Sequence, residues 1–240
     1  MSPAECDAIQ RAGEPELAPS TGTGALKNGR FERTNIVGRT SYNAWCMGQC
    51  AHDPTVRLID ARIANATGFS WKNMEYYQIL RYEASQEYQG HSDWIDMQAQ
   101  QPSGPRVFTF FLYLNDVPDG GGGATWFPQA TVNGTDGGVV ESRLQDFSSV
   151  SQYYGRYNTE EGRKTMRSPA EEFAGVGFRA HPSRGSAIMW PNVDLDDVYR
   201  QHPKTMHAAE EVAEGHVKWA ANAWIHMRDF RTPHAKGLTG

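Results

Sequence analysis

Three residues of this chain could together bind one metal ion. His91 and Asp93 are separated by one residue, and on an extended chain alternate side chains point to the same side. His207 lies between two predicted strands, where its imidazole could complete the set. Two histidines and one carboxylate form a three-ligand face that suits iron(II) better than zinc and leaves other positions open. The sequence therefore predicts a metal centre of His91, Asp93 and His207.

Alternatives exist for each of these residues. Taken alone, His-x-Asp is common, and a surface histidine beside a capping aspartate is its more frequent explanation. His202 competes with His207 for the third ligand position. The remaining histidines lack a carboxylate at a matching spacing and are expected on the surface or in the core; they include His52, His181, His216 and His234.

A strand predicted from Lys218 could present a cation to the same cavity. Alternate residues of a strand share one face, and here they are Lys218, Ala220, Asn222, Trp224 and His226. Such a face combines a cation, an aromatic wall and an imidazole. The alternative is a surface lysine that keeps its ammonium group in water.

Composition limits what kind of protein this can be. The chain has 240 residues, 39% of them hydrophobic and 11% aromatic, enough for one domain over residues 1–240. The net charge is −5 with scattered Lys and Arg, which argues against nucleic acid as a partner. No apolar run approaches the ~20 residues of a membrane span, and no signal-peptide core follows Met1. We expect a soluble chain.

The cysteines leave one question open. Three cysteines are too few for a disulfide scaffold, which favours separate thiols. Cys46 and Cys50 could nevertheless pair with each other.

Periodicity predicts helices followed by strands. A capping box at residues 2–5 begins one helix, and Asp53-Pro54 begins a second, which should end at Gly68. Residues 19–50 are expected to form loop with at most an edge strand. The expected strands cover residues 76–82, 106–114, 186–190 and 218–227. This is an α+β pattern of helices on a β-sandwich or jelly roll, with a polar surface insertion at about 129–180.

Five blocks of this sequence resemble the prolyl 4-hydroxylase family and occur in that family's order. The most specific include His91-Ser92-Asp93 and Thr205-Met206-His207-Ala208-Ala209. The blocks cover residues 80–93, 106–128, 184–190, 205–209 and 218–226. His202 lacks the residues that surround His207, so the resemblance favours His207 as the third ligand.

The resemblance implies both a fold and an activity. The fold would be a double-stranded β-helix (jelly-roll, cupin-like) core with amino-terminal helices packed on the major sheet. The activity would be Fe(II)- and 2-oxoglutarate-dependent hydroxylation of peptidyl proline to 4-hydroxyproline, with release of succinate and CO2. Dioxygen would be consumed, ascorbate would support turnover, and the partner would be a proline-containing peptide or protein.

The resemblance also implies roles for individual residues. Lys218 would bind the C5 carboxylate of 2-oxoglutarate, with Tyr82 and Thr125 hydrogen bonding to the same molecule. The peptide would contact Tyr88, Arg106, Trp224 and His226. One departure affects Lys218, because this chain has one residue more after His207 than the family's usual spacing. The connecting turn can absorb that residue if His207 and Lys218 lie on successive strands.

Other functions stay open at this point. The same chemistry could act on another protein side chain or a small molecule, and a jelly roll can also be a non-catalytic binding module. The resemblance suggests the lumen of the endoplasmic reticulum, with the cytoplasm as the alternative. The sequence leaves the oligomeric state undetermined.

Overall fold

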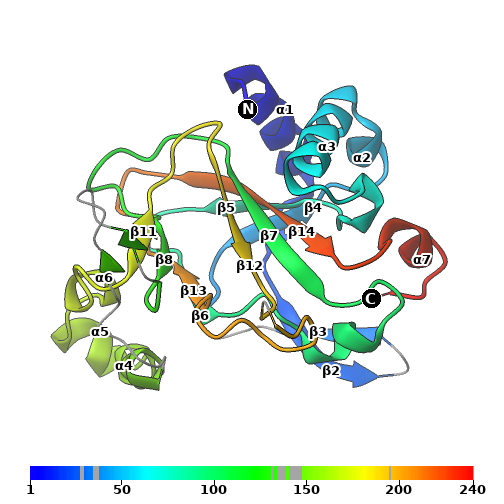
Figure 1. Cartoon of the computed structure of the whole chain (residues 1–240). Coiled ribbons are helices and arrows are strands. Elements are labelled where there is room, and N and C mark those ends of the chain that lie inside the picture. Colours follow the sequence, from blue (N-terminus) through cyan, green and yellow to red (C-terminus); the bar gives the residue numbers. More distant parts are fainter. Residues whose placement is uncertain are drawn as a thin grey trace.

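Two antiparallel sheets form the centre of the molecule (Figure 1). The computed structural model describes the chain except residues 28–29, 35–37, 131, 134–138, 141–147, 195 and 240. The major sheet has the order β1 (Ala18–Pro19), β4 (Tyr42–Trp45), β5 (Gln78–Tyr82), β14 (Lys218–His226), β7 (Arg106–Tyr113) and β12 (Ala187–Pro191). The minor sheet has the order β11 (Phe178–Ala180), β8 (Thr125–Phe127), β13 (His207–Ala209) and β6 (Tyr88–His91). Two-stranded pairs join β2 (Gly22–Lys27) to β3 (Arg30–Thr34) and β9 (Val132–Asn133) to β10 (Val139–Val140).

Strand alternation divides the core into layers. On β7, Leu112 packs toward the helices while Phe111 and Tyr113 face the space between the sheets. Partners from the minor sheet, such as Phe127 and Ala209, meet them there. Burial on both faces explains why β7 is apolar along most of its length. The four long strands expected from periodicity are confirmed within a few residues.

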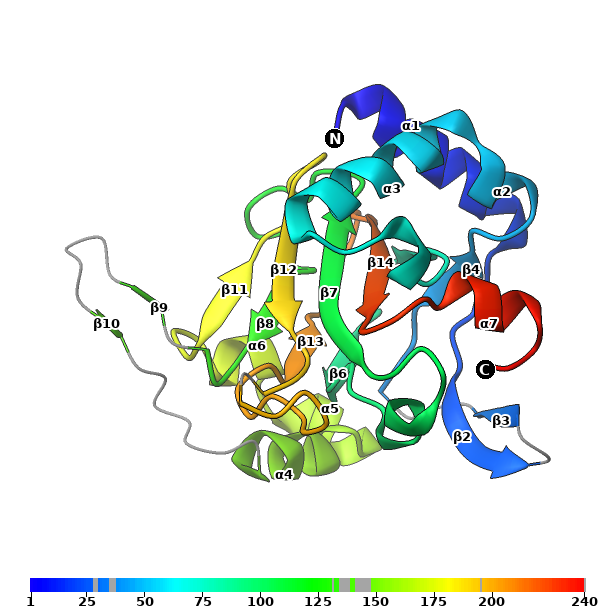
Figure 2. The same cartoon turned by 45° about the vertical axis from the view of Figure 1, so that its right-hand side comes forward.

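Helices cover the outer face of the major sheet (Figure 2). They are α1 (Pro3–Gly13), α2 (Gln49–His52) and α3 (Pro54–Thr67). The capping box of α1 and the Asp53 cap of α3 are both formed, and Gly68 ends α3 with a φ of 75°. Shorter elements are η1 (Glu14–Glu16), η2 (Trp71–Asn73), η3 (Asp96–Gln100) and α7 (Arg231–Ala235).

The segment at about 129–180 contains more structure than its polar composition indicates. Three helices lie in it: α4 (Ser148–Tyr157), α5 (Glu160–Thr165) and α6 (Pro169–Glu172). Val150 and Tyr154 of α4 are buried against Trp126 and Ala208 of the minor sheet. The expectation that this stretch contributes nothing to the core was therefore wrong for α4, whereas several residues between 131 and 147 lie outside the described part. Its status as an insertion stays a prediction.

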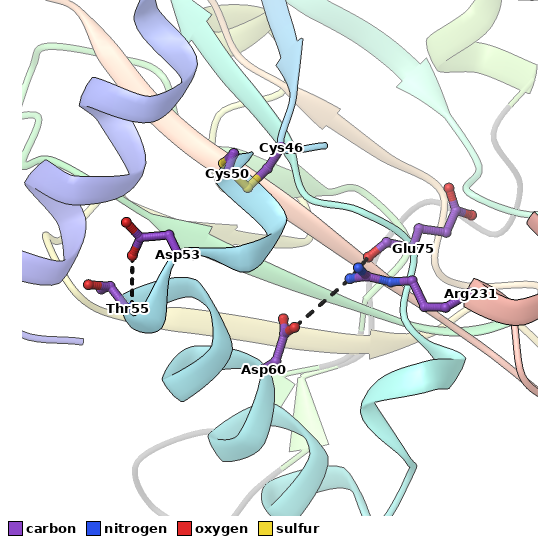
Figure 3. The surroundings of a disulfide bond; sticks show 7 residues. All are labelled: Cys46, Cys50, Asp53, Thr55, Asp60, Glu75 and Arg231. Carbon is purple, nitrogen blue, oxygen red and sulfur yellow. Dashed lines mark hydrogen bonds and ion pairs between the residues drawn. A yellow bond between two sulfur atoms is a disulfide. The ribbon is translucent and has the colours of Figure 1, made fainter. Parts of the chain in front are cut away.

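Cys46 and Cys50 form a disulfide, with a Cα–Cα distance of 5.0 Å (Figure 3). The expectation of separate thiols was wrong, because the turn between β4 and α2 brings the two side chains together. The expectation of loop over residues 19–50 was also wrong, since β4 lies inside the major sheet. Apolar alternation is weak in β4, so periodicity did not reveal it.

Among the residues that the structure describes, no helix has the length and apolar character needed to cross a membrane.

Candidate active site

The three predicted metal ligands come together between β6 and β13. His91 ends β6, Asp93 follows it, and His207 begins β13 directly opposite His91 in the strand register. One possible ligand atom from each lies within 4.8 Å of the others. In the described ranges of the chain, this is the only group of three or more such residues. Because β6 and β13 pair side by side, residues separated by over a hundred positions in the sequence form one site.

Backbone carbonyls orient both imidazoles. Nδ1 of His91 lies 2.9 Å from the carbonyl oxygen of Gln89, and Nδ1 of His207 lies 3.0 Å from that of Thr205. A carbonyl can only accept, so each Nδ1 carries a proton, and in the neutral ring Nε2 offers the lone pair that a metal ion would bind. These Nε2 atoms lie 4.0 Å and 3.7 Å from the carboxylate oxygens of Asp93. The donor set therefore fits a single divalent ion.

Two buried polar residues hold Asp93 in place, one directly and the other through the first. The hydroxyl of Thr109 donates to Oδ2 of Asp93 at 2.6 Å, and Nδ2 of Asn192 donates to Thr109 at 2.9 Å. Burial raises the pKa of Asp93, but His207, His91 and Arg106 outweigh it, so the pKa is lowered. The carboxylate is thus both ionised and oriented.

Lys218 lies fully buried between the sheets. Its Nζ makes no hydrogen bond with any residue that the structure describes. The ammonium group lies 5.1 Å from the ring centre of Tyr82, 5.4 Å from that of Phe111 and 5.7 Å from that of Tyr113. Burial lowers the pKa of Lys218 to about 7, although the charge of Glu210 opposes the shift. A buried cation without a partner fits an anionic ligand, because burying it alone is unfavourable.

Tyr82 and Thr125 are the residues predicted to bind 2-oxoglutarate together with Lys218. Tyr82 is opposite Lys218 in the β5–β14 register, and Thr125 bonds the hydroxyl of Tyr113 at 2.8 Å. Gly123 has a φ of +70°, and a Cβ there would contact Lys218 and Val212 at 3.3 Å. Glycine therefore leaves room beside the lysine. The structure thus places Tyr82 beside Lys218 and links Thr125 to Tyr113, whose ring centre lies 5.7 Å from the ammonium group.

Two of the four predicted peptide-binding residues belong to a buried charge network. Arg106 donates to both oxygens of Glu75, at 2.5 Å and 3.0 Å, and Nε2 of His226 bonds Glu75 at 2.8 Å. Nδ1 of His226 bonds the carbonyl of Gly104 at 2.7 Å. Both partners of this ring are acceptors, so both nitrogens carry a proton. Burial raises the pKa of Glu75, but Arg106 and His226 outweigh it and hold the pKa at about 2.

The other two residues predicted to contact the peptide are aromatic. Tyr88 stacks on His91 with 3.6 Å between ring centres, and Arg39 lies 4.5 Å above the Tyr88 ring. Trp224 lies under the guanidinium of Arg106 at 3.8 Å. Its buried Nε1 has no hydrogen-bond partner in the described part of the chain. The two rings therefore flank the metal ligands and the charge network.

Sequence reasoning missed several residues of this site. They are Arg39, Glu75, Thr109, Tyr113 and Asn192. Thr109 offered one signal, as the one aliphatic hydroxyl within the apolar run of β7. Glu75 precedes β5 and looked like an ordinary loop carboxylate.

Comparisons with known proteins agree with this geometry. Probable prolyl 4-hydroxylase 3 of Arabidopsis thaliana is 28% identical over 240 residues, which cover 96% of this chain and 68% of that protein. Prolyl 4-hydroxylase subunit alpha-1 of Rattus norvegicus is 26% identical, covering 97% of this chain and 34% of the subunit. The chain thus spans about two thirds of that plant protein and one third of the rat subunit.

Solved structures show the fold. The viral collagen prolyl hydroxylase vCPH from Paramecium Bursaria Chlorella virus-1, in its 2OG complex, has a TM-score of 0.54 at 20% identity, covering 94% of this chain and 90% of that one. A prolyl hydroxylase from Trichoplax adhaerens, in complex with a hypoxia inducible factor oxygen degradation domain peptide fragment, has a TM-score of 0.52 at 10% identity, covering 96% and 80%. These structures share the jelly-roll fold of 2-oxoglutarate oxygenases with this chain.

A family model described as the 2OG-Fe(II) oxygenase superfamily matches residues 77–226, the range that contains all three clustered ligands and Lys218. An enzyme of this class uses Fe(II), 2-oxoglutarate and dioxygen, which suits the donor set and the unpartnered lysine. The matching range, the fold and the chemistry of the site agree, and the chain belongs to the 2OG-Fe(II) oxygenase superfamily.

Proposed function

We propose that this chain hydroxylates peptidyl proline to 4-hydroxyproline, with release of succinate and CO2 from 2-oxoglutarate. The observation that carries the proposal is the pairing of a three-ligand cluster with a buried, unpartnered lysine. The relatives named above are prolyl 4-hydroxylases, which supports proline as the oxidised residue. The peptide bound by the Trichoplax adhaerens protein supports a peptide rather than a free amino acid.

His91, Asp93 and His207 would hold the iron. When bound, iron with 2-oxoglutarate and dioxygen supplies the oxidative chemistry that inserts one oxygen atom into a C–H bond. The protein's contribution is orientation, since Nε2 of each histidine is left free and Asp93 is fixed by Thr109.

Lys218 would bind the C5 carboxylate of 2-oxoglutarate. A charge-assisted hydrogen bond there would give the buried ammonium group its missing partner. Tyr82 and Thr125 would add hydrogen bonds, and the rings of Phe111 and Tyr113 would exclude water from the ion pair.

This role predicts that 2-oxoglutarate binds less tightly as the pH rises. The pKa of Lys218 is about 7 before the ligand binds, and only the protonated lysine attracts a carboxylate. The dissociation constant should therefore increase about fivefold from pH ~7 to pH ~8, and up to about tenfold per unit beyond. Binding is measured by titration at saturating metal. Lys218→Arg, which stays charged, should remove this dependence; a wild-type constant that does not change with pH would contradict the role.

Arg106, Trp224 and Tyr88 would contact the peptide. The buried Nε1 of Trp224 can donate to a peptide carbonyl, and the aromatic rings suit a polyproline-like strand. His226 is fully buried with both nitrogens engaged, so we propose that it positions Glu75 and Arg106 instead of touching the peptide. This proposal replaces the direct contact expected for His226.

We predict that Glu75→Gln destabilises the protein by about 2 kcal/mol, because Arg106 and His226 lose their shared counterion. The folded pKa of Glu75 is below its ordinary value, so its stabilisation is present above pH ~4.5 and is lost as the pH falls toward ~2. Urea unfolding should show a smaller loss of stability across that window in the variant. An equal loss of stability in acid for both proteins would show that the network of Glu75, Arg106 and His226 contributes little to the free energy of unfolding.

We propose that the chain works in an oxidising compartment, such as the lumen of the endoplasmic reticulum. Disulfides persist mainly where the surroundings are oxidising, and Cys46–Cys50 fits that condition. Thiol titration of denatured protein purified without reductant should find the single thiol of Cys6. Three titratable thiols would argue for the cytoplasm. Ascorbate stays a prediction, tested by its effect on turnover number over many cycles.

The proposed function is tested by incubating the enzyme with a proline-rich peptide, Fe(II) and 2-oxoglutarate in air. Mass spectrometry should find hydroxyproline in the peptide, in a yield equal to the succinate released. A matched peptide with alanine in place of proline should stay unmodified. Hydroxylation of another side chain, or of the alanine peptide, would show that proline is not the substrate.

A further inference from the structure

We propose that a cavity among α2, α3, η2 and α7 binds a small organic carboxylate. The cavity has a volume of about 270 Å³. Besides two small residues next to the disulfide, it is lined by His52, Arg57, Trp71, Tyr76 and Arg231. None of these residues belongs to the active site described above. The cavity is therefore a separate place with its own chemistry.

Two arginines of this cavity are held in place before any ligand binds. Cζ of Arg231 lies 4.0 Å from the ring centre of Tyr76, and the guanidinium group donates to two backbone carbonyls, at 2.7 Å and 3.0 Å. Cζ of Arg57 lies 3.8 Å from the ring centre of Trp71. Cations that are already oriented lose less entropy when an anion binds.

The two arginines share one carboxylate at long range. Oδ2 of Asp60 lies 3.5 Å from Nη1 of Arg57 and 4.0 Å from Nη2 of Arg231. Figure 3 shows the side chain of Arg231 reaching toward Asp60. Close charge-assisted hydrogen bonds measure about 2.7–2.9 Å, so neither arginine is fully paired with Asp60. Burial also raises the pKa of Asp60, which weakens it as a counterion.

The cavity therefore has an excess of positive charge. Two arginines and one aspartate carry a net charge of at least +1, and no acidic residue lies among the described residues that line the walls. An anion that enters would give both guanidinium groups a second partner. The side chain of Arg57 is 39% exposed, whereas that of Arg231 is 11% exposed, so the ligand would enter on the side of Arg57.

Shape and size narrow the class of ligand. A guanidinium group binds a flat carboxylate through two parallel hydrogen bonds. Cavities that bind small molecules begin at about 300 Å³, which is close to the volume found here. The rings of Trp71 and Tyr76 and the small residues of the walls suit an apolar body behind the carboxylate.

The test titrates the enzyme with benzoate in the presence of saturating Fe(II) and 2-oxoglutarate and in the absence of oxygen. No turnover occurs under these conditions, and 2-oxoglutarate keeps benzoate away from Lys218. Calorimetry should show saturable binding of benzoate. Benzamide, which has nearly the same shape but no charge, should not bind.

Variants of α3 locate the bound benzoate. Arg57→Gln should weaken its binding about 10-fold or more, because a charge-assisted hydrogen bond is lost. Arg57→Lys keeps the charge but not the planar fork, and should restore part of the affinity. Arg62→Gln is the matched control, since Arg62 lies on the same helix but bonds Glu5, and it should bind benzoate as wild type does.

Absence of saturable benzoate binding to wild type would overturn the proposal. So would equal affinities in wild type and folded Arg57→Gln, or an equal loss of affinity in Arg62→Gln. Benzoate that competes with 2-oxoglutarate would have bound at the active site, which would also contradict the proposal. Circular dichroism of each variant separates a binding effect from a failure to fold. These outcomes do not depend on which residue the enzyme hydroxylates.

Discussion

Alanine at His91, Asp93 or His207 is expected to abolish iron-dependent turnover. Each substitution removes one of three donors whose ligand atoms converge within 4.8 Å. Loss of a residue that only supports a ligand lowers metal affinity about 10- to 100-fold, so losing a ligand should cost at least about 100-fold. Anaerobic iron titration measures this affinity directly. The fold should persist, because the three side chains contribute ligand atoms more than core volume, and circular dichroism checks this.

His202→Ala is the matched control for His207→Ala. His202 precedes His207 in the segment between β12 and β13 but is not one of the clustered ligands. Burial lowers the pKa of His202, and its Nδ1 accepts from the amide of Lys204. We expect the variant to keep most of its activity and iron affinity. An active His207→Ala together with an inactive His202→Ala would show that the distal ligand had been misassigned.

Lys218→Ala should weaken 2-oxoglutarate binding and leave iron binding almost unchanged. The variant leaves the C5 carboxylate unpaired in a buried pocket, which costs on the order of 2–4 kcal/mol, or about 30- to 1000-fold in affinity. Lys218→Arg should restore only part of the lost affinity for 2-oxoglutarate, since the longer planar guanidinium must displace the rings of Tyr82 and Tyr113. The apparent KM for 2-oxoglutarate in succinate-release assays is the measurement.

An unchanged KM in Lys218→Ala would mean that another cation binds the carboxylate. Arg228 is the alternative cation because it follows β14 directly in the sequence, but its side chain is exposed and donates to the carbonyl of Pro102. The structure therefore favours Lys218. Combining the alanine variant with the pH titration separates the two cases, because arginine does not titrate near pH ~7.

Periodicity was enough to predict the side chains that lie on a single strand or directly after it. His91 and Asp93 share a side, and Lys218 shares an inner face with Trp224, because alternation fixes direction locally. The one residue more than the family's usual spacing lies between His207 of β13 and Lys218 of β14, and the turn between these strands contains Val212, which is buried and accepts at its carbonyl from the amide of Ser85. A loop could take up that residue, whereas a strand would have turned the lysine outward.

Contacts between distant elements could not be predicted in the same way. Glu75 meets Arg106 and His226 only because the sheet order brings three separate segments together. Thr109 reaches Asp93 for the same reason. Polar side chains of this kind look like ordinary loop or strand residues until their neighbours are known.

Weak patterns hid two further features. The strand β4 has little alternation, so neither its place in the major sheet nor the pairing of Cys46 with Cys50 followed from the sequence. In α4, Val150 and Tyr154 pack on the minor sheet although the surrounding composition is polar. A short amphipathic helix within a polar stretch gives too few apolar positions to stand out.

Labelled dioxygen gives the most direct test of the central claim, that iron on His91, Asp93 and His207 couples 2-oxoglutarate oxidation to proline hydroxylation. Wild-type enzyme with a proline-rich peptide should place one labelled oxygen atom in hydroxyproline and one in succinate, in equal amounts. Lys218→Ala should lower both together, and His207→Ala should abolish both. Succinate formed without label in the peptide, or hydroxyproline formed in the His207→Ala variant, would contradict the account.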